Sequence, residues 1–301
     1  MGARPALAIH PGALGDVLLA VPALRALRAG GPLALAAQPR VGALLHALDV
    51  VHEALAFDSL RLDALFTDDA ARVPALARFE RLVSWFGARD PAFTRRLRAL
   101  VPGAVVAPSV RPGVAVWEHL LETVGAPAGE WRAPIALPEG VRALGAEALV
   151  AAGMDAPRPW LFVHPGAGGA AKQWPAQGFA RVVSTLAARA RINVLVHQGP
   201  ADAAAVAALR RHLGEGAVAL TDPALPALAG ALARAAVFVG NDSGVSHLAA
   251  ALGVPSLILF DARHLDWRPW WPGARVRTVT LTALEAGDAA AVVEDLLELL
   301  Q

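Results

Sequence analysis

The segment Gly240-Asn-Asp-Ser-Gly-Val-Ser-His-Leu-Ala-Ala250 decides how this chain folds. It follows an apolar run, residues 235–239, that predicts a buried strand, and it continues into residues 248–252, which predict a helix packed under a sheet. Asp242 and Ser243 are residue types typical of helix N-caps, and Gly244 lets a ligand approach the backbone because it lacks a Cβ. A strand, a polar turn and a helix in this order are typical of an α/β protein.

The same turn is a candidate anion site. The first turn of a helix presents unpaired N–H groups and the positive end of the helix dipole, which together favour a diphosphate. The donors are the N–H groups of Ser243, Gly244 and Val245, and we expect the ring of His247 to lie within reach of the same anion. The alternative is an ordinary capped turn that stabilises the helix by ~1 kcal/mol and binds nothing.

Composition limits the class of protein. A length of 301 residues predicts two domains of about 150 residues each. The chain is 55% hydrophobic, but its longest uncharged run, 243–260, contains glycine, histidine and proline and fits helix, turn and strand better than a membrane span. The absence of cysteine excludes disulfides, and a net charge of +1 gives no reason to expect nucleic acid. The N-terminus lacks the features of a secretory signal, so we expect a cytoplasmic protein.

The first half of the chain predicts a parallel sheet, because strands alternate with helices. A first strand over 6–10 leads through a turn into a helix that runs to residue 27, with Pro22 in its early turns. Asp16 therefore stands at the carboxyl edge of a strand, where open parallel sheets bind their ligands. Further strands are predicted over 33–37, 50–57, 82–85 and 104–107, and helices over 41–48, 92–100 and 114–124.

One helix of this half, 92–100, carries three arginines: Arg95, Arg96 and Arg98. Such a cluster is usually a solvated face. The alternative is that it attracts an acidic substrate or the anionic surface of a membrane.

The second half begins after a proline-containing linker over 125–140. Its first strand, 160–164, is followed by Pro165-Gly166, as the first strand of the chain is followed by Pro11-Gly12, which suggests two similar domains around one cleft. A glycine-rich loop over 166–175 carries Lys172, the only lysine, and is suited to close over a phosphate group, although it lacks the spacing of a Walker loop. Strands are predicted over 192–197, 217–220 and 256–260, and helices over 179–188, 201–213, 225–233 and 289–300.

The loop 261–273 offers two further candidates. Its three tryptophans suit either stacking on a nucleobase or packing between domains. Asp261, His264 and Asp266 resemble a metal-ligand set, but no second cluster accompanies them, so we predict no metal site and no cofactor.

Three separated segments resemble the signature blocks of glycosyltransferase family 9, the lipopolysaccharide heptosyltransferases and their relatives. They are Gly12-Ala-Leu-Gly-Asp-Val-Leu-Leu-Ala-Val-Pro-Ala-Leu-Arg25, His164-Pro-Gly-Ala-Gly168 with Lys172-Gln-Trp-Pro175, and residues 240–250. They occur in the family's order and span most of the chain. The resemblance implies a GT-B fold, in which two Rossmann-like domains with parallel sheets face a central cleft. We expect an acceptor domain over 1–135 and a sugar-nucleotide donor domain over 136–301, with the last helix able to pack back on the first domain.

The resemblance also implies an activity: inverting, metal-independent transfer of a heptose from ADP-heptose to a lipopolysaccharide core acceptor. By position in the family motif, Asp16 is the catalytic base. Lys172, Ser243, Gly244, Val245 and His247 would bind the donor diphosphate, Asp242 would cap the turn or contact the donor sugar, and Gly15 and His10 would contact the acceptor. The expected partners are a nucleotide-diphosphate sugar and a lipid-linked or saccharide acceptor, with peripheral contact with the inner membrane and no nucleic acid.

The chain departs from the family pattern at two points. His10 stands where many members have arginine, and residues 261–264 replace the usual Gly-Pro-Thr beside the donor. Two other functions share the architecture: a sugar-nucleotide 2-epimerase, which needs acid and base groups around the donor sugar, and a non-catalytic sugar-nucleotide-binding protein, in which a carboxylate near the anion has no purpose. A dinucleotide dehydrogenase is disfavoured because G-x-G-x-x-G is absent after the first strand.

Overall fold

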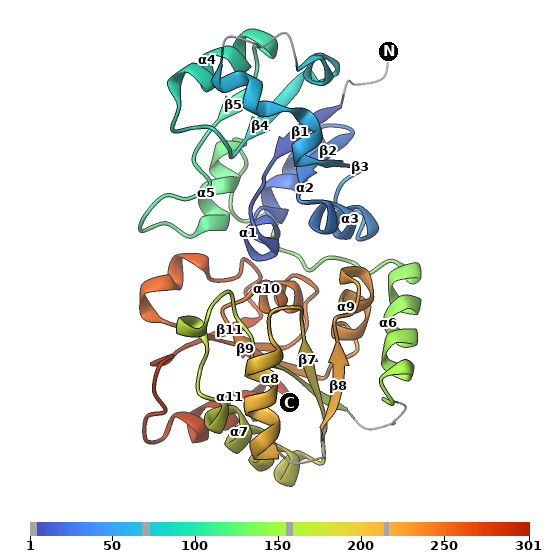
Figure 1. The fold of residues 1–301 in the computed structure, drawn as a ribbon, viewed down its shortest axis with the longest axis vertical. Helices are drawn as coiled ribbons and strands as arrows, with labels where there is room; N and C mark the ends of the chain where they lie inside the picture. Colours follow the sequence, from blue (N-terminus) through green and yellow to red (C-terminus); the bar gives the residue numbers. More distant parts are fainter. Residues whose placement is uncertain (1–4, 68–72, 155–158, 214–216) are drawn as a thin grey trace. The chain divides into compact units, whose positions relative to one another are not determined.

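The computed structural model describes residues 5–67, 73–154, 159–213 and 217–301. The chain divides into two compact units, Met1–Ala133 and Pro134–Gln301, and each contains one parallel sheet with helices around it (Figure 1). The predicted fold class, two Rossmann-like α/β domains, is confirmed. No helix within the described residues is long and apolar enough to cross a membrane.

The first unit is a five-stranded sheet in the order β3-β2-β1-β4-β5, with every pair parallel. Its central strand is wholly buried and apolar, as a strand covered by helices on both faces must be. The elements are β1 Ala6–Ile9, α1 Leu14–Leu19, α2 Val21–Ala29, β2 Leu33–Ala37, α3 Pro39–Ala47, β3 Glu53–Ala56, β4 Arg81–Ser84, α4 Pro91–Leu100, β5 Val105–Val106 and α5 Val116–Thr123, with 3-10 helices at Phe57–Leu60, Leu62–Phe66 and Pro74–Arg78.

The prediction of one continuous helix after β1 is wrong. The structure has two, α1 and α2, separated at Ala20, so that Pro22 stands at the second position of α2. The reason is the ring of Pro22, which removes an N–H and would clash with the carbonyl of Leu18 in an unbroken helix. The short α1 therefore ends one turn after Asp16.

The second unit is a six-stranded parallel sheet in the order β11-β10-β9-β6-β7-β8, the strand order of a complete dinucleotide-binding fold. The elements are α6 Glu139–Ala151, β6 Trp160–His164, α7 Ala176–Ala190, β7 Asn193–Gln198, α8 Ala203–Leu213, β8 Val218–Thr221, α9 Leu225–Leu232, β9 Val237–Asn241, α10 Gly244–Ala251, β10 Ser256–Phe260, β11 Ala274–Thr278 and α11 Asp288–Leu299, with 3-10 helices at Ala170–Lys172 and Ala262–Trp267.

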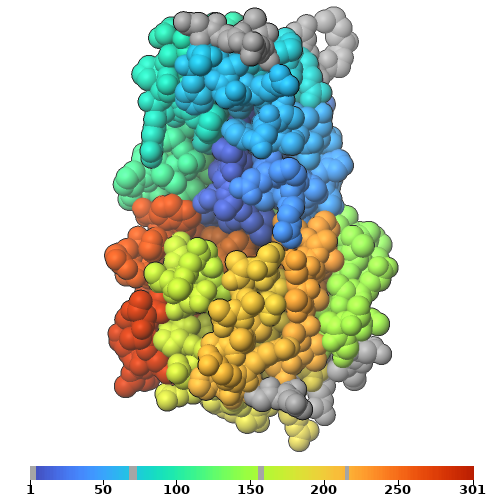
Figure 2. Space-filling model, viewed as in Figure 1, coloured from blue at the N-terminus to red at the C-terminus, as the bar shows by residue number. Residues whose placement is uncertain are grey.

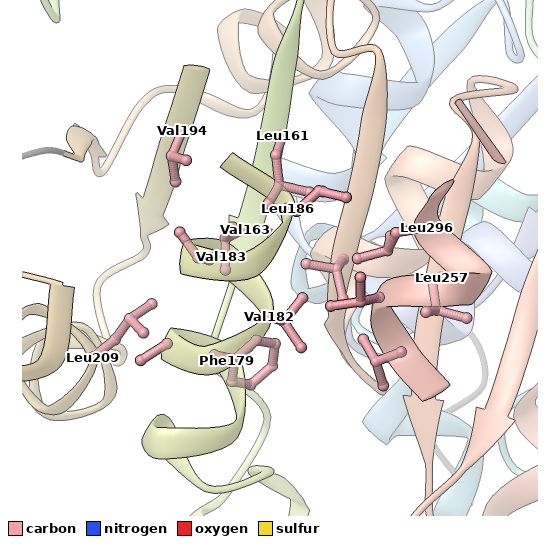
Figure 3. Packing of buried hydrophobic residues seen from close by; sticks show 14 of the residues in the cluster. Leu161, Val163, Phe179, Val182, Val183, Leu186, Val194, Leu209, Leu257 and Leu296 are labelled. Carbon is pink, nitrogen blue, oxygen red and sulfur yellow. The ribbon is translucent and has the colours of Figure 1, made fainter. Parts of the chain in front are cut away.

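The core of this unit forms between one face of its sheet and the helices α7 and α11. Phe179, Val182, Val183 and Leu186 recur at helical spacing along α7 and point toward the strands, where Leu161 and other strand residues meet them (Figure 3). Each of these side chains stabilises the fold by about 1.5–3 kcal/mol on full burial. This packing holds the sheet whose carboxyl edge carries the candidate site.

Two elements of the second unit are not predicted from the sequence: α6 and β11. The start of α6 falls within the region predicted as a linker, and its exposed Leu144 and Val150 weaken the amphipathic pattern. α6 packs on α9 through glycine, since a Cβ at Gly145 would overlap the backbone of Gly230. In the space-filling view the light green surface of α6 lies along the orange surface of α9 (Figure 2).

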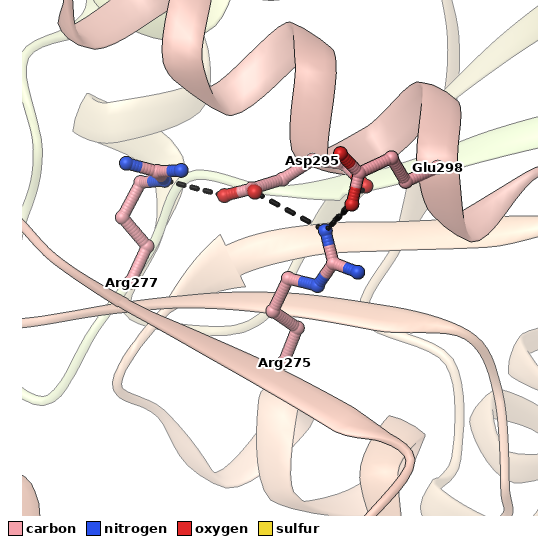
Figure 4. Close-up of polar contacts among 4 residues, drawn as sticks. All are labelled: Arg275, Arg277, Asp295 and Glu298. Atoms are coloured by element: carbon pink, nitrogen blue, oxygen red, sulfur yellow. Dashed lines mark hydrogen bonds and ion pairs between the residues drawn. The ribbon is translucent and has the colours of Figure 1, made fainter.

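The edge strand β11 is held to α11 by ion pairs. Asp295 accepts from Arg277 and, at 3.1 Å, from Arg275, which also binds Glu298 at 2.7 Å (Figure 4). The resulting hydrogen bonds and charge raise the pKa of both arginines. α11 also packs on α7 and buries Val292, Val293 and Leu296, so the terminal helix belongs to the core of the second unit.

Candidate functional site

Both sheets contain the place where open parallel sheets bind ligands, the point at which strand order reverses. In the second unit this point lies between β6 and β9, and in the first unit it lies between β1 and β4. The sequence-predicted residues lie in the segments that follow these strands: Lys172 and 242–247 in the second unit, and His10, Gly15 and Asp16 in the first.

The second unit joins Lys172, Asp242 and His247 in one polar cluster. Lys172 Nζ lies 2.9 Å from Asp242 Oδ2, and His247 Nε2 lies 3.4 Å from Asp242 Oδ1. Burial alone would raise the pKa of Asp242, but hydrogen bonds and charge from His247 and Lys172 outweigh it, and the pKa lies below its usual value. The carboxylate is therefore ionised, and it holds Lys172 and the ring of His247 beside the start of α10.

Of the two N-cap residue types in this turn, Ser243 is the cap and Asp242 is not, so the prediction that Asp242 contacts the donor sugar is the alternative that remains. Ser243 Oγ accepts the N–H of Ser246 at 3.2 Å, and Ser246 Oγ in turn donates to the carbonyl of Asn241. Asp242 is turned to Lys172 and His247 instead. The N–H groups of Gly244 and Val245 are in the first turn of the helix, where no intrahelical acceptor exists, and both residues are half-buried.

Asn241 is a site residue that sequence analysis missed. Its Oδ1 accepts the N–H of Trp174 at 3.0 Å, and its Nδ2 donates to the carbonyl of Pro165 at 2.8 Å. One buried amide thus fastens both ends of the glycine-rich loop to the end of β9 and sets where Lys172 can lie. The only signal in the sequence is a polar side chain at the end of an apolar strand.

The first unit brings His10, Gly12 and Asp16 together after β1. The carboxylate of Asp16 accepts the N–H of Ala13 at 3.3 Å, which is the backbone group at the N-cap of α1. A Cβ at Gly12 would lie 2.7 Å from the His10 ring and 2.9 Å from Asp16 Cβ, so this turn requires glycine. Asp16 is half-buried, as is Gly15, the second residue of α1.

His10 is buried at the reversal point, where its ring lies 5.6 Å from that of Trp85 after β4. Burial lowers its pKa to about 4, although the charge of Asp16 opposes the shift. The ring is therefore neutral at pH 7. Its Nδ1 accepts the N–H of Gly12 at 3.2 Å, which leaves the proton on Nε2, a buried atom that has no hydrogen-bond partner among the residues that the structure describes.

Two other candidate groups, two arginines of α4 and Asp261, have partners within the protein. Arg96 and Arg98 donate to the backbone carbonyls of Leu65 and Ala104, so these two members of the arginine cluster hold their own unit together. Arg95 and Arg98 are exposed, and Arg96 is half-buried. Both carboxylate oxygens of Asp261 accept hydrogen bonds from the guanidinium group of Arg263, and Oδ1 also accepts the backbone N–H of that residue.

One group of side chains can hold a metal ion, and it is not the one considered in loop 261–273. Among the described residues, one group of three or more histidine, cysteine, aspartate or glutamate side chains has its ligand atoms within 4.8 Å of one another, and it consists of His164, His197 and Asp202. All three are buried. The sequence does not single them out as a group, because His164 ends β6 whereas His197 and Asp202 lie in β7 and the loop after it.

Comparison with known proteins gives the same fold and family. The model of glycosyltransferase family 9 (heptosyltransferase) matches residues 101–289. Lipopolysaccharide heptosyltransferase 3 of Escherichia coli is 30% identical over 167 residues, 46% of this chain and 47% of that protein. The structure of a family 9 glycosyltransferase from Veillonella parvula superposes with a TM-score of 0.76 at 17% identity, covering 99% of this chain and 97% of that chain.

The structure of the E. coli ADP-heptose lipopolysaccharide heptosyltransferase II is also similar, with a TM-score of 0.70, 21% identity and 98% of each chain covered. At such identities the structures share the fold. The chain spans less than half the length of the curated relatives that it matches, 36% and 47%. The family model covers well over half of this chain, and the chain therefore belongs to glycosyltransferase family 9, the heptosyltransferase family.

Proposed function

We propose that this protein transfers a heptose or a related sugar from a nucleotide-diphosphate donor, ADP-heptose, to a lipopolysaccharide core acceptor. The transfer inverts the anomeric centre and needs no metal. The observation that carries the proposal is the cluster of Lys172, Asp242 and His247 beside the start of α10, at the point where the strand order of the second sheet reverses. The similar E. coli protein is named for ADP-heptose, which supports this choice of donor.

The donor diphosphate binds at the start of α10. Gly244 and Val245 offer N–H groups there, and Lys172 supplies a full positive charge from the loop held by Asn241. When the bond between the anomeric carbon and the phosphate oxygen breaks, negative charge grows on the leaving nucleoside diphosphate, and these donors stabilise it. Asp242 keeps Lys172 and His247 in position before the donor arrives.

The acceptor reacts at the first unit. Asp16 takes the proton of the acceptor hydroxyl as its oxygen attacks the anomeric carbon from the face opposite the leaving group. The neutral state of the nearby His10 supports this role. A positively charged ring beside Asp16 would stabilise the ionised carboxylate and weaken it as a base. His10 and Gly15 then lie beside the acceptor. The exposed Arg95 suits an acidic lipid-linked acceptor at the inner-membrane surface.

The direct test is product formation. The protein is incubated with ADP-heptose and a lipid A–Kdo acceptor in a buffer containing EDTA, and the lipid is analysed by mass spectrometry. We expect the mass of one heptose to be added. Conversion of the donor without acceptor would indicate an epimerase, and no reaction from folded protein with ADP-, GDP- and UDP-sugars would contradict transfer.

The base is tested by Asp16→Asn, which preserves shape and removes the proton acceptor. General base catalysis contributes roughly 10²–10⁴-fold, so we expect turnover to fall at least ~100-fold while ADP binds as before. Asp58→Asn, an exposed carboxylate of the same unit, is the matched control. Wild-type turnover in the Asp16 variant would remove this residue from the mechanism.

The donor site is tested by Lys172→Ala in calorimetry with ADP. A hydrogen bond to a charged group contributes ~1.5–3 kcal/mol, so the dissociation constant should rise roughly 10- to 100-fold. Arg181→Ala removes an exposed positive charge from α7 and should leave the dissociation constant unchanged. Equal dissociation constants in the two variants would make Lys172 a loop residue with no part in binding.

A further inference from the structure

A group of three buried polar side chains lies at the carboxyl edge of the second sheet and takes no part in the proposed transfer. His164 ends β6, His197 is the next-to-last residue of β7, and Asp202 directly precedes α8. The exposed fractions of these residues are 3%, 3% and 8%. Polar groups so far from water are costly unless each has a partner, so their presence together requires an explanation.

The sheet itself brings the two histidines together. β6 and β7 are parallel neighbours with Val163 opposite Val196, which puts His164 opposite His197 one position later. Their Nδ1 atoms face each other at 3.0 Å. Two ligands of a tetrahedral zinc ion, each bound at 2.0–2.1 Å, lie about 3.3–3.4 Å apart, so the two nitrogens are already near the spacing that one ion would impose.

The third ligand is oriented by backbone. The N–H of Gly199 donates to Asp202 Oδ2 at 2.9 Å, which leaves Oδ1 for another partner. A Cβ at Gly199 would lie 2.8 Å from Oδ2, and a Cβ at Gly166 would overlap Oδ1, so glycine at both positions makes room for this carboxylate. Hydrogen bonding of a ligating carboxylate to a second partner is typical of metal sites.

The protonation state of the histidines suits ligation. Burial lowers the pKa of His164 to about 4 and that of His197 to about 3, and the neighbouring ring lowers the latter further. Both rings are neutral at pH 7, the form in which imidazole binds a metal. The simpler explanation is that one hydrogen bond joins the two neutral rings and that the Gly199 N–H binds Asp202 Oδ2. Neither of these contacts uses Asp202 Oδ1.

We propose that His164, His197 and Asp202 bind one divalent transition-metal ion of the zinc class. One ligand atom from each lies within 4.8 Å of the others, a slightly open arrangement that closes on an ion by a small rotation of the carboxylate. Two imidazoles and one carboxylate favour Zn²⁺ or Co²⁺ over Mg²⁺ or Ca²⁺, which prefer oxygen ligands. The ion ties β6, β7 and α8 together where the glycine-rich loop begins, and it has no part in the proposed transfer.

The test uses untagged full-length protein freed of metal by dialysis against a chelator. We expect calorimetry to give one zinc ion per chain with a submicromolar dissociation constant, Co²⁺ to produce the visible absorption of a tetrahedral site, and zinc to raise the unfolding temperature. Mg²⁺ should do none of these. Absence of zinc uptake by the wild-type protein would overturn the proposal.

Variants locate the site. His197→Ala and Asp202→Asn should each weaken zinc binding at least ~10-fold, whereas His212→Ala, an exposed histidine on α8, should leave it unchanged. Circular dichroism of the metal-free proteins checks that the variants fold. If His197→Ala does not fold, Asp202→Asn decides, because asparagine keeps an acceptor for Gly199 and loses only the charge. Zinc binding equal to wild type in Asp202→Asn would place the ion elsewhere and refute the assignment.

Discussion

Gly166→Ala should destabilise the second unit, because the new methyl group has no room. Gly166 begins the glycine-rich loop, and a Cβ there would overlap Oδ1 and Cγ of Asp202. Asp202 can move aside only by giving up the N–H of Gly199, which its carboxylate accepts at 2.9 Å in a buried position. A lost hydrogen bond to a charged group costs ~1.5–3 kcal/mol, and overpacking costs a further ~1–3 kcal/mol.

We therefore expect the free energy of unfolding to fall by about 2.5–6 kcal/mol. Urea unfolding followed by tryptophan fluorescence measures this, with the slope m checked for equality between variants. Gly168→Ala is the control in the same loop, since a Cβ there meets nothing within 4 Å, and it should change stability by less than ~1 kcal/mol. A Gly166→Ala protein as stable as Gly168→Ala would refute the packing described for Asp202.

Two further predictions concern stability. His10, His164 and His197 have pKa values of about 4, about 4 and about 3, below the usual 6.5, because they are buried. In metal-free protein between pH ~6.5 and pH ~4, these histidines bind protons in the unfolded chain but not in the folded protein. Urea unfolding should therefore show that the free energy of unfolding falls toward pH 4 by up to ~1.4 kcal/mol per pH unit for each histidine. A free energy of unfolding that does not change with pH would contradict this. In α6, Gly145→Ala should destabilise by ~1–3 kcal/mol or more by forcing the helix off α9, whereas Gly140→Ala, open to solvent, should stabilise by up to ~1 kcal/mol, and equal effects would refute the close packing.

Much of the fold could be predicted because its signals are local. β6 and β10 are confirmed at both ends, since each is a short apolar run bounded by proline, glycine or a polar residue. β11 could not be predicted, because its alternating arginines look like a solvated segment until Asp295 and Glu298 on α11 bind them. The missed α6 packs through glycine, which a search for large apolar residues does not detect.

The amino-acid sequence by itself determined where the polar turns fall, because cap residues, glycines and apolar periods act over a few neighbouring positions. It could place Lys172, Asp242 and Ser243 in candidate loops, but not decide which of the last two caps the helix. Only the tertiary structure decided that Asp242 pairs with Lys172, 70 positions away, and that His164 meets His197, 33 positions away. Such pairs depend on the order of the strands in the sheet. That order depends on how the faces of the whole sheet are buried, and this cannot be predicted from a pattern of neighbouring residues.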